Sequence, residues 1–321
     1  MHRMIGYVEA GEHEWQEAYQ SYLNLIGQVD TVFGKIRENH FIVADCMKPI
    51  VDTIYWEHRK LLEFVIAAQA ARKEQAKQAV DAAILGAALS GVLRLSFSQG
   101  RKVTEAALLH DVGMLVIPQE ILGKSDSLSE IEQQYIEAHP AQSYRLINRE
   151  FHCFEGVAEI AVQRHECWNG EGYPKGLSGG GIALEARIIA VTDTFAALIG
   201  ERPYRPALGG QQAMIQVVSE GMEQFDPDVA DAFSRMMGMY PIGSLVELNN
   251  GASARVLKYD EGAPLLKPRV RIVRGAPGEP LKQGTVIDLA KEKDLRIKHP
   301  LERQDILMDL IAGPVAHEPI G

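Results

Sequence analysis

Apolar residues recur at helical spacing through the first two thirds of the chain. The first 75 residues show this spacing twice, in Tyr19–Ile26 and again in Ile54–Ile66. A repeat of three to four residues is typical of one buried face of an α-helix. We therefore expect residues 1–75 to form an N-terminal helical region. Its expected role is packing or dimerisation, so a homodimer is one predicted assembly.

The helical pattern continues from residue 76 to residue 240. Ser129 followed by Glu132 fits a capping box, which starts one of the predicted helices. The expected helices are Ala82–Leu93, Val103–His110, 130 to about 148, Phe154–His165, Glu185–Ile199, Ala213–Met222 and Pro227–Met239. Gly170–Gly181 holds six glycines in twelve residues, so we expect a loop there.

The pattern changes at Tyr240-Pro241. Four short runs rich in Val, Ile and Leu follow, separated by Gly, Pro and Asn, which indicates strands and turns. They are Ser244–Leu248, Ala254–Tyr259, Arg269–Val273 and Gly284–Leu289. The predicted fold class is mainly α: a helical region (1–75), a helical domain (76–240), a small β module (241–300) and a tail (301–321).

Charge and cysteine content narrow the class of protein. The net charge of −10 argues against a protein that holds a nucleic acid polymer by counterion release, although a local basic pocket stays open. The three cysteines form no Cys-x-x-Cys, which suits a reducing cytosol. No apolar signal segment follows Met1, and the longest uncharged apolar run, Ala82–Leu93, is shorter than the ~20 residues of a membrane span. We expect a cytoplasmic protein without membrane contact.

Metal-ligand residue types lie at the ends of several predicted helices. His110 and Asp111 end an apolar helix, and His139, His165 and Asp193 follow in order. Imidazole and carboxylate groups both bind divalent ions, and a carboxylate can bridge two of them. A satisfied core histidine with a helix-terminal aspartate is the alternative for the first pair. For Asp193, inside an apolar run, the alternative is a hydrogen bond to its neighbour or a helix cap.

These residues belong to a longer set of motifs that resembles the HD-GYP domain, a bacterial branch of the HD phosphohydrolases. The resemblance runs from about residue 74 to residue 240. It is carried by Leu108–Gly113, Ile117-Pro118, Ile121–Lys124, His139-Pro140, His165-Glu166, Gly170–Leu177, Ala186–Ile188, Val191–Asp193 and Arg202–Arg205. It implies an all-helical domain with a two- or three-metal centre, usually iron or manganese. The implied substrate is cyclic di-GMP, hydrolysed to pGpG or GMP. The β module also resembles an appendage common in this family.

The resemblance implies a role for each candidate residue. The implied metal ligands are His110, Asp111, His139, His165 and Asp193, with Asp111 bridging two ions and so central to catalysis. One metal position would use His110, Asp111 and Asp193, and the other would use Asp111, His139 and His165.

The chain departs from the family pattern at several of its positions. Gln78 stands where a helical histidine is expected, Met114 replaces a lysine, and Arg164 replaces the first histidine of His-His-Glu. Asn169 replaces an aspartate before the Gly-x-Gly-Tyr-Pro turn, and Ala196 replaces a second acidic residue. An arginine is permanently cationic and cannot coordinate a metal. Arg164 in the site would repel an ion, or would pair with Asp111 and offer a fork to a phosphate.

The substrate-binding positions are better preserved. The resemblance assigns Arg202 and Arg205 to contacts with the phosphates and bases of the dinucleotide, and Tyr173 to the pocket wall. A solvated surface pair is the alternative for the arginines. The Gly170–Gly181 loop is either part of this pocket or a turn that contacts a signalling partner.

Three functions stay open on the sequence. The first is a binder of cyclic di-GMP or a related dinucleotide whose phosphodiester hydrolysis is weak or lost. The second is an active metal-dependent phosphodiesterase with a reduced metal centre of one or two iron or manganese sites. The third is an interaction module that binds signalling proteins and no nucleotide.

Overall fold

The structure, a computed structural model, describes most of the chain in nine stretches. They are residues 12–38, 44–67, 74–124, 126–152, 154–201, 205–221, 223–260, 262–275 and 284–301. Within these stretches no helix is both long enough and apolar enough to cross a membrane. The predicted tail, residues 301–321, lies outside the described residues apart from Leu301.

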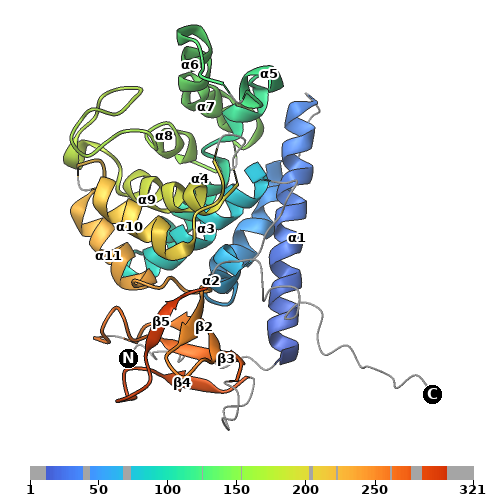
Figure 1. Cartoon of the computed structure of the whole chain (residues 1–321). Helices are drawn as coiled ribbons and strands as arrows, with labels where there is room; N and C mark the ends of the chain where they lie inside the picture. Colours follow the sequence, from blue (N-terminus) through green and yellow to red (C-terminus); the bar gives the residue numbers. More distant parts are fainter. Residues whose placement is uncertain are drawn as a thin grey trace.

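The helices form one mass with a small sheet at its end (Figure 1). In chain order they are α1 (Glu12–Arg37), η1 (Ala44–Met47), α2 (Lys48–Ala67), α3 (Glu74–Val92), α4 (Phe97–Leu109), η2 (Val112–Val116), α5 (Gln119–Leu122), α6 (Glu130–Glu137), α7 (His139–Glu150), α8 (Val157–Ala161), η3 (Gly179–Gly181), α9 (Leu184–Ile199), α10 (Gly210–Glu220) and α11 (Pro227–Met237). The predicted mainly α fold is confirmed.

Helix α3 is the centre of the helical core. Residues 79–90 are buried without interruption, so most of the uncharged run Ala82–Leu93 lies in a buried helix. Helices α1, α2, α4 and α9 pack around it. A helix that is apolar on all sides must be enclosed by others, and this enclosure explains why α3 needs four neighbours.

A buried ionic group ties α1 to α3. Lys77 and Asp81 form an ion pair one turn apart on α3, and Tyr22 of α1 donates its hydroxyl to Asp81 at 2.7 Å. Lys77 also donates to the carbonyl of Val65 at the end of α2, at 3.3 Å. The N-terminal helices are therefore packed into the same core as the motif-bearing helices.

Two of the predicted helices differ from the structure. The capping box of Ser129 and Glu132 is present, but the helix that follows ends at Glu137 and a second begins at His139. Pro140 has no N–H to donate to the carbonyl of Ile136, so the continuous hydrogen-bond ladder stops there. The predicted helix Phe154–His165 is helical only over Val157–Ala161.

The C-terminal strands form one antiparallel sheet of order β4-β3-β2-β1-β5. The strands are β1 (Leu245–Leu248), β2 (Ser253–Lys258), β3 (Arg269–Arg274), β4 (Val286–Asp288) and β5 (Ile297–Pro300). The first four match the predicted runs. The fifth was not predicted, because its mostly exposed sequence Ile-Lys-His-Pro lacks the alternation of a half-buried strand; such residues are typical of a sheet edge.

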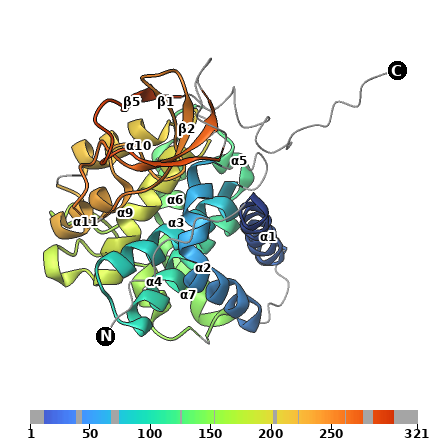
Figure 2. The same cartoon turned by 90° about the horizontal axis from the view of Figure 1, so that it is seen from below.

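The sheet joins the helical mass beside α10 and α11, with α1 alongside (Figures 1 and 2). At this junction Arg255 of β2 lies over the ring of Trp15 of α1, with its guanidinium carbon 5.0 Å from the ring centre. Glu63 of α2 is half-buried there. Burial raises the pKa of its carboxyl, and the charges of Arg255 and Arg271 lower it by less, so that its pKa is raised overall.

Candidate metal centre

The end of α4 is held against the start of α7 by a glycine. The backbone N–H of Gly113 donates to the hydroxyl of Ser143 at 2.9 Å. A Cβ at Gly113 would lie 2.2 Å from the carbonyl oxygen of His139, so no larger residue fits without moving α7. The glycine two residues after Asp111 therefore brings His110 and Asp111 next to His139.

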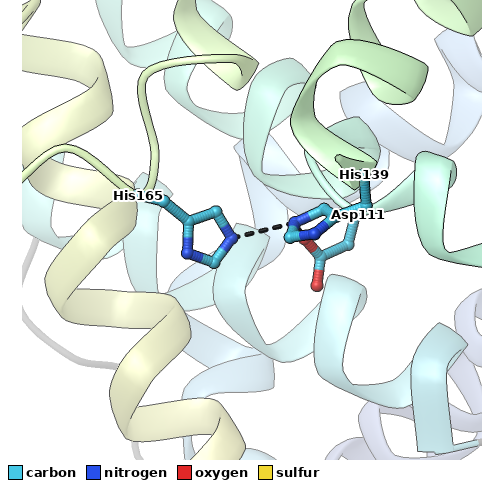
Figure 3. Close-up of side chains that lie close together, drawn as sticks. All are labelled: Asp111, His139 and His165. Carbon is cyan, nitrogen blue, oxygen red and sulfur yellow. Dashed lines mark hydrogen bonds and ion pairs between the residues drawn. The ribbon is translucent and has the colours of Figure 1, made fainter. Parts of the chain in front are cut away.

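All five predicted ligands come together at this point. Asp111, His139 and His165 form one group that could hold a metal ion (Figure 3), and His110, Asp111 and Asp193 form a second. Within each group the ligand atoms lie within 4.8 Å of one another. Asp111 belongs to both groups, as expected of a bridging carboxylate.

Backbone carbonyls orient two of the imidazole rings. The Nδ1 of His110 lies 2.9 Å from the carbonyl of Ala107, and the Nδ1 of His139 lies 2.6 Å from the carbonyl of Ile136. The second carbonyl is the one that Pro140 leaves without its helical partner. Each Nδ1 must donate to its carbonyl, so each Nε2 points into the centre, as in many metal sites.

Two ligand atoms in the centre are buried and unbonded. The Nε2 of His110 and the Oδ1 of Asp111 have no hydrogen-bond partner among the described residues, although they lie 3.3 Å apart. The Oδ1 of Asp111 is also 3.3 Å from the Nε2 of His139. The Asp111 side chain is 35% exposed, so the centre opens to solvent on this side. Buried polar atoms without partners are uncommon and often mark a functional site.

Arg164 points into the same centre. One arm of its guanidinium pairs with Oδ2 of Asp193, and the other, Nη1, lies 3.0 Å from the Nδ1 of His165. The alternative that Arg164 pairs with Asp111 is therefore wrong: Asp193 accepts its ion pair. Only 15% of the Arg164 side chain is exposed, so this is a buried interaction.

Two of the other departures from the family pattern, Gln78 and Ala196, lie near Asp193. Gln78 of α3 donates its amide to Oδ1 of Asp193 at 2.6 Å, so the position expected to carry a ligand histidine does reach the centre. Ala196 is buried on the next turn of α9. Met114 lies half-buried in η2.

The electrostatics of the centre follow from two carboxylates in a buried space. Burial lowers the pKa of His110, but Asp111 and Asp193 outweigh burial and raise it to about 10. Burial raises the pKa values of both carboxyls, and the neighbouring cations outweigh it and hold both well below their usual range. Burial and the charge of Arg164 together lower the pKa of His165 to about 2.

The Gly-x-Gly-Tyr-Pro loop is organised by Glu166. Its buried carboxylate accepts the backbone N–H groups of Lys175 and Leu177, each at 2.8 Å. A Cβ at Gly172 would lie 2.2 Å from the backbone nitrogen of Cys167, so the loop folds back on itself only with glycine there. The sequence alone did not predict this role of Glu166. A charged residue beside a glycine-rich loop was the one signal for it.

The loop places Tyr173 against the centre. Its ring stacks on His165 with 4.7 Å between ring centres and 15° between planes. Burial raises the pKa of the Tyr173 hydroxyl to about 12. Tyr173 thus covers one face of a candidate metal ligand.

The two arginines expected to bind phosphate differ in what can be described. Arg202 lies outside the described residues. The guanidinium of Arg205 donates to the carbonyls of Ala197, Leu198 and Pro206 at 3.0 to 3.1 Å. It therefore caps the carbonyl end of α9, and its assignment to a dinucleotide stays a prediction.

The family described as "HD domain" matches residues 61–229, more than half of the chain. The chain belongs to the HD domain family. The region after it, residues 245–308, matches a "KOW domain associated with HD domain". The expected resemblance and the β appendage are confirmed at this level.

Several relatives with described activities are similar to this HD domain protein. It is 35% identical over 205 residues to "Cyclic di-GMP phosphodiesterase PA4108" of Pseudomonas aeruginosa, covering 64% of this chain and 49% of the relative. It is 40% identical over 144 residues to "Cyclic di-GMP phosphodiesterase response regulator RpfG" of Xanthomonas campestris, covering 44% of this chain and 38% of the relative. The chain thus spans about half or less of the length of these two relatives.

A solved structure supports the fold of the HD domain. The protein described as "Bd1817, a HDG"Y"P protein from Bdellovibrio bacteriovorus" superposes with a TM-score of 0.56 and 18% sequence identity, over 72% of this chain and 73% of that one. At this identity the likeness concerns the fold alone.

The HD domain family implies a metal, and the donor chemistry of the centre is of the right kind. Histidine nitrogens and carboxylate oxygens suit iron, manganese and zinc, and the unbonded atoms of His110 and Asp111 are where a cation would gain most. The arrangement, however, does not fit a metal pair. Arg164 is hydrogen-bonded to His165 of one group and to Asp193 of the other, so a permanent positive charge lies against one ligand residue of each group and would repel the ions.

Proposed function

We propose that this HD domain protein binds a cyclic dinucleotide, cyclic di-GMP or a related molecule, and that its hydrolysis of the phosphodiester is weak or lost. Relatives named as cyclic di-GMP phosphodiesterases support the ligand class. So does the relative named "3'3'-cGAMP-specific phosphodiesterase 3" of Vibrio cholerae, 35% identical over 136 residues. The proposed setting is bacterial signalling in the cytoplasm.

The observation that carries the loss of hydrolysis is the position of Arg164. A guanidinium has five donor hydrogens and no lone pair for a metal. Its two contacts engage one ligand of each candidate metal group. Two ions held by these residues would activate water and stabilise the charge of the reacting phosphate, and a centre that holds one ion or none would lose most of that rate.

The dinucleotide would meet the centre where it opens. The Asp111 side chain is partly exposed, and the ring of Tyr173 stacks on the neighbouring ligand His165. In this proposal Tyr173 contacts a base or ribose, and Arg202 and Arg205 contact the phosphates. Arginine suits both partners, because its plane is bidentate to phosphate and stacks on purines.

Binding and turnover are tested together on the purified chain. We expect calorimetric titration to show binding of cyclic di-GMP, and product analysis with Mn²⁺ or Fe²⁺ under anaerobic conditions to show little or no pGpG or GMP. Turnover equal to that of an active relative, lost in Asp111→Ala, would contradict the proposal.

An active phosphodiesterase with a reduced metal centre is the second candidate, favoured by the unbonded atoms of His110 and Asp111. These two atoms lie 3.3 Å apart and are a nitrogen and an oxygen of ligand type, so one ion that displaces the proton of His110 could bind both. Metal analysis after anaerobic purification separates the two proposals. About one equivalent of iron or manganese, together with turnover, favours the second.

A partner-binding module without nucleotide is the third candidate, favoured by the open tip of the Gly170–Gly181 loop. At Gly179, Gly180 and Gly181 an added Cβ would meet nothing within 4 Å, so a signalling protein could approach this backbone. Micromolar binding of cyclic di-GMP that is lost in the Arg202→Ala, Arg205→Ala double variant would exclude this candidate.

A further inference from the structure

A chain of hydrogen bonds with a fixed direction runs through the centre. It links Arg164 to His165 and His165 to His139 (Figure 3 shows the second link). The distances are 3.0 Å from Arg164 Nη1 to His165 Nδ1 and 2.9 Å between the two Nε2 atoms. Because each group in the chain can act only as donor or acceptor at a given atom, the positions of the hydrogens follow.

The first link fixes the tautomer of His165. A guanidinium only donates, so the Nδ1 of His165 must accept and carries a lone pair. A neutral imidazole has one N–H, so the hydrogen of His165 lies on Nε2.

The second link agrees with the first from the opposite end. The carbonyl of Ile136 only accepts, so the Nδ1 of His139, 2.6 Å away, carries the hydrogen of that ring. The Nε2 of His139 therefore has the lone pair that accepts from His165 Nε2–H. It has no hydrogen left for Asp111, whose Oδ1 lies 3.3 Å away and has no hydrogen-bond partner in the described part of the chain.

This direction is opposite to what a metal needs. A histidine that binds an ion through Nε2 must have a lone pair there, and His165 would have to move its hydrogen to Nδ1. That N–H would then face the N–H of Arg164, donor against donor. In the second group the other arm of Arg164 holds Asp193, and its charge repels a divalent ion.

We propose that Arg164 takes the place of a metal ion in this centre. It neutralises Asp193 with one arm and with the other holds His165 in the Nε2–H tautomer, so that metal binding and the present position of Arg164 exclude each other. This inference deepens the proposed function. Only its consequence for hydrolysis rests on that function. Its structural content stands on the hydrogen bonds alone.

Nitrogen-15 NMR of the histidines tests the tautomer directly in the full chain. The protein is labelled with ¹⁵N-histidine, kept in chelator-treated buffer, and the His165 signals are assigned with His165→Gln. We expect His165 to show a protonated Nε2 and an unprotonated Nδ1, with a correlation to His139 across the hydrogen bond. An Nδ1–H tautomer at His165 would overturn the proposal, and this measurement needs no variant of Arg164.

Mn²⁺ titration tests the exclusion. We expect Arg164→His to bind Mn²⁺ at least tenfold more tightly than the wild type, and Arg164→Gln to show a smaller gain because its amide can accept as well as donate. Arg235→His is the matched control, since Arg235 is exposed on α11 and pairs only at the surface with Asp231. Wild-type affinity equal to that of Arg164→His would overturn the proposal.

The two proposals fail separately. A wild type that does not bind cyclic di-GMP but shows the Nε2–H tautomer and weak Mn²⁺ binding removes the proposed ligand and keeps the role of Arg164. A wild type that binds both cyclic di-GMP and Mn²⁺ tightly keeps the proposed ligand and removes the role of Arg164.

Discussion

Two buried arginines of this protein are in opposite electrostatic situations. Arg255, at the junction of sheet and helices, is 4% exposed, and burial lowers its pKa despite the nearby Glu63. Arg164, in the centre, is also desolvated, but Asp193 and Asp111 outweigh burial and raise its pKa. The surroundings of Arg255 thus disfavour a charged guanidinium, whereas those of Arg164 favour one.

The difference follows from the groups that surround each arginine. At the junction one carboxylate faces more than one arginine and an aromatic ring, which is an arrangement for packing two parts of the chain together. In the centre two carboxylates and three histidines converge, which is an arrangement for cations. Arg164 is one such cation, supplied by the chain itself.

The largest expected effect is the loss of Arg164. In metal-free buffer, Arg164→Ala should lower the free energy of unfolding by about 3–5 kcal/mol, because it leaves Asp193 charged and buried without its main cation. Millimolar Mn²⁺ should restore much of this stability in the variant and little in the wild type. Urea denaturation with and without Mn²⁺ measures both. Arg235→Ala, at an exposed ion pair, should change stability by less than about 1 kcal/mol. If Arg164→Ala is as stable as the wild type without metal, Arg164 does not compensate the charge of Asp193 as described.

A smaller effect is expected at the junction. Arg255→Met should cost about 2 kcal/mol, because it removes the cation from the face of Trp15 and leaves Glu63 with less compensation. Adding Glu63→Gln should recover most of that loss, since it removes the carboxylate whose charge Arg255 partly offsets. Mn²⁺ should have no effect on either variant. A change in the stability of either variant with Mn²⁺ would contradict the claim that only the centre is suited to a metal ion.

Another buried carboxylate, Asp81, extends the comparison. It is paired with Lys77 and accepts from Tyr22, and it lies outside both candidate metal groups. Tyr22→Phe should cost about 1 kcal/mol, the usual value of one buried hydrogen bond. Thermal unfolding with and without Mn²⁺ should give the same loss in both conditions. A metal-dependent loss would place Asp81 with the centre.

The smallest expected effect is a pH dependence at the junction. Burial raises the pKa of Glu63 above its usual 4.5, so the folded protein holds this proton more tightly than the unfolded chain. The stability from Glu63 is then full below about pH 4.5 and is lost as pH rises through the folded value. Stability curves of wild type and Glu63→Gln, measured from pH 4.5 to 7, should converge toward low pH. Parallel curves would contradict the assignment.

Much of the fold could be predicted because local patterns agree with it. The uncharged run within α3 required burial, the capping box of Ser129 set the start of α6, and the turn-rich region after Tyr240 gave four of the five strands. The prediction was wrong where a single backbone group decided the outcome. Pro140 divides one predicted helix in two, and β5 pairs at an edge where side chains carry little pattern.

The residues of the candidate site were predicted, but their pairing was not. Sequence order shows that His110, Asp111, His139, His165 and Asp193 belong to one family motif, and the structure brings them together. It does not show which carboxylate accepts Arg164, because that depends on how the turn after α8 faces α9. The acceptor role of the Ile136 carbonyl follows from Pro140 only when the fold is known.

Anomalous diffraction from crystals grown with Mn²⁺ tests the role of Arg164 most directly. The central claim is that a guanidinium of the chain occupies the place of a metal ion. We expect no anomalous peak within bonding distance of Asp111 in the wild type, with Arg164 between Asp193 and His165, and a peak at that position in Arg164→His. A wild-type peak bound by Asp111, His139 and His165 would contradict the claim.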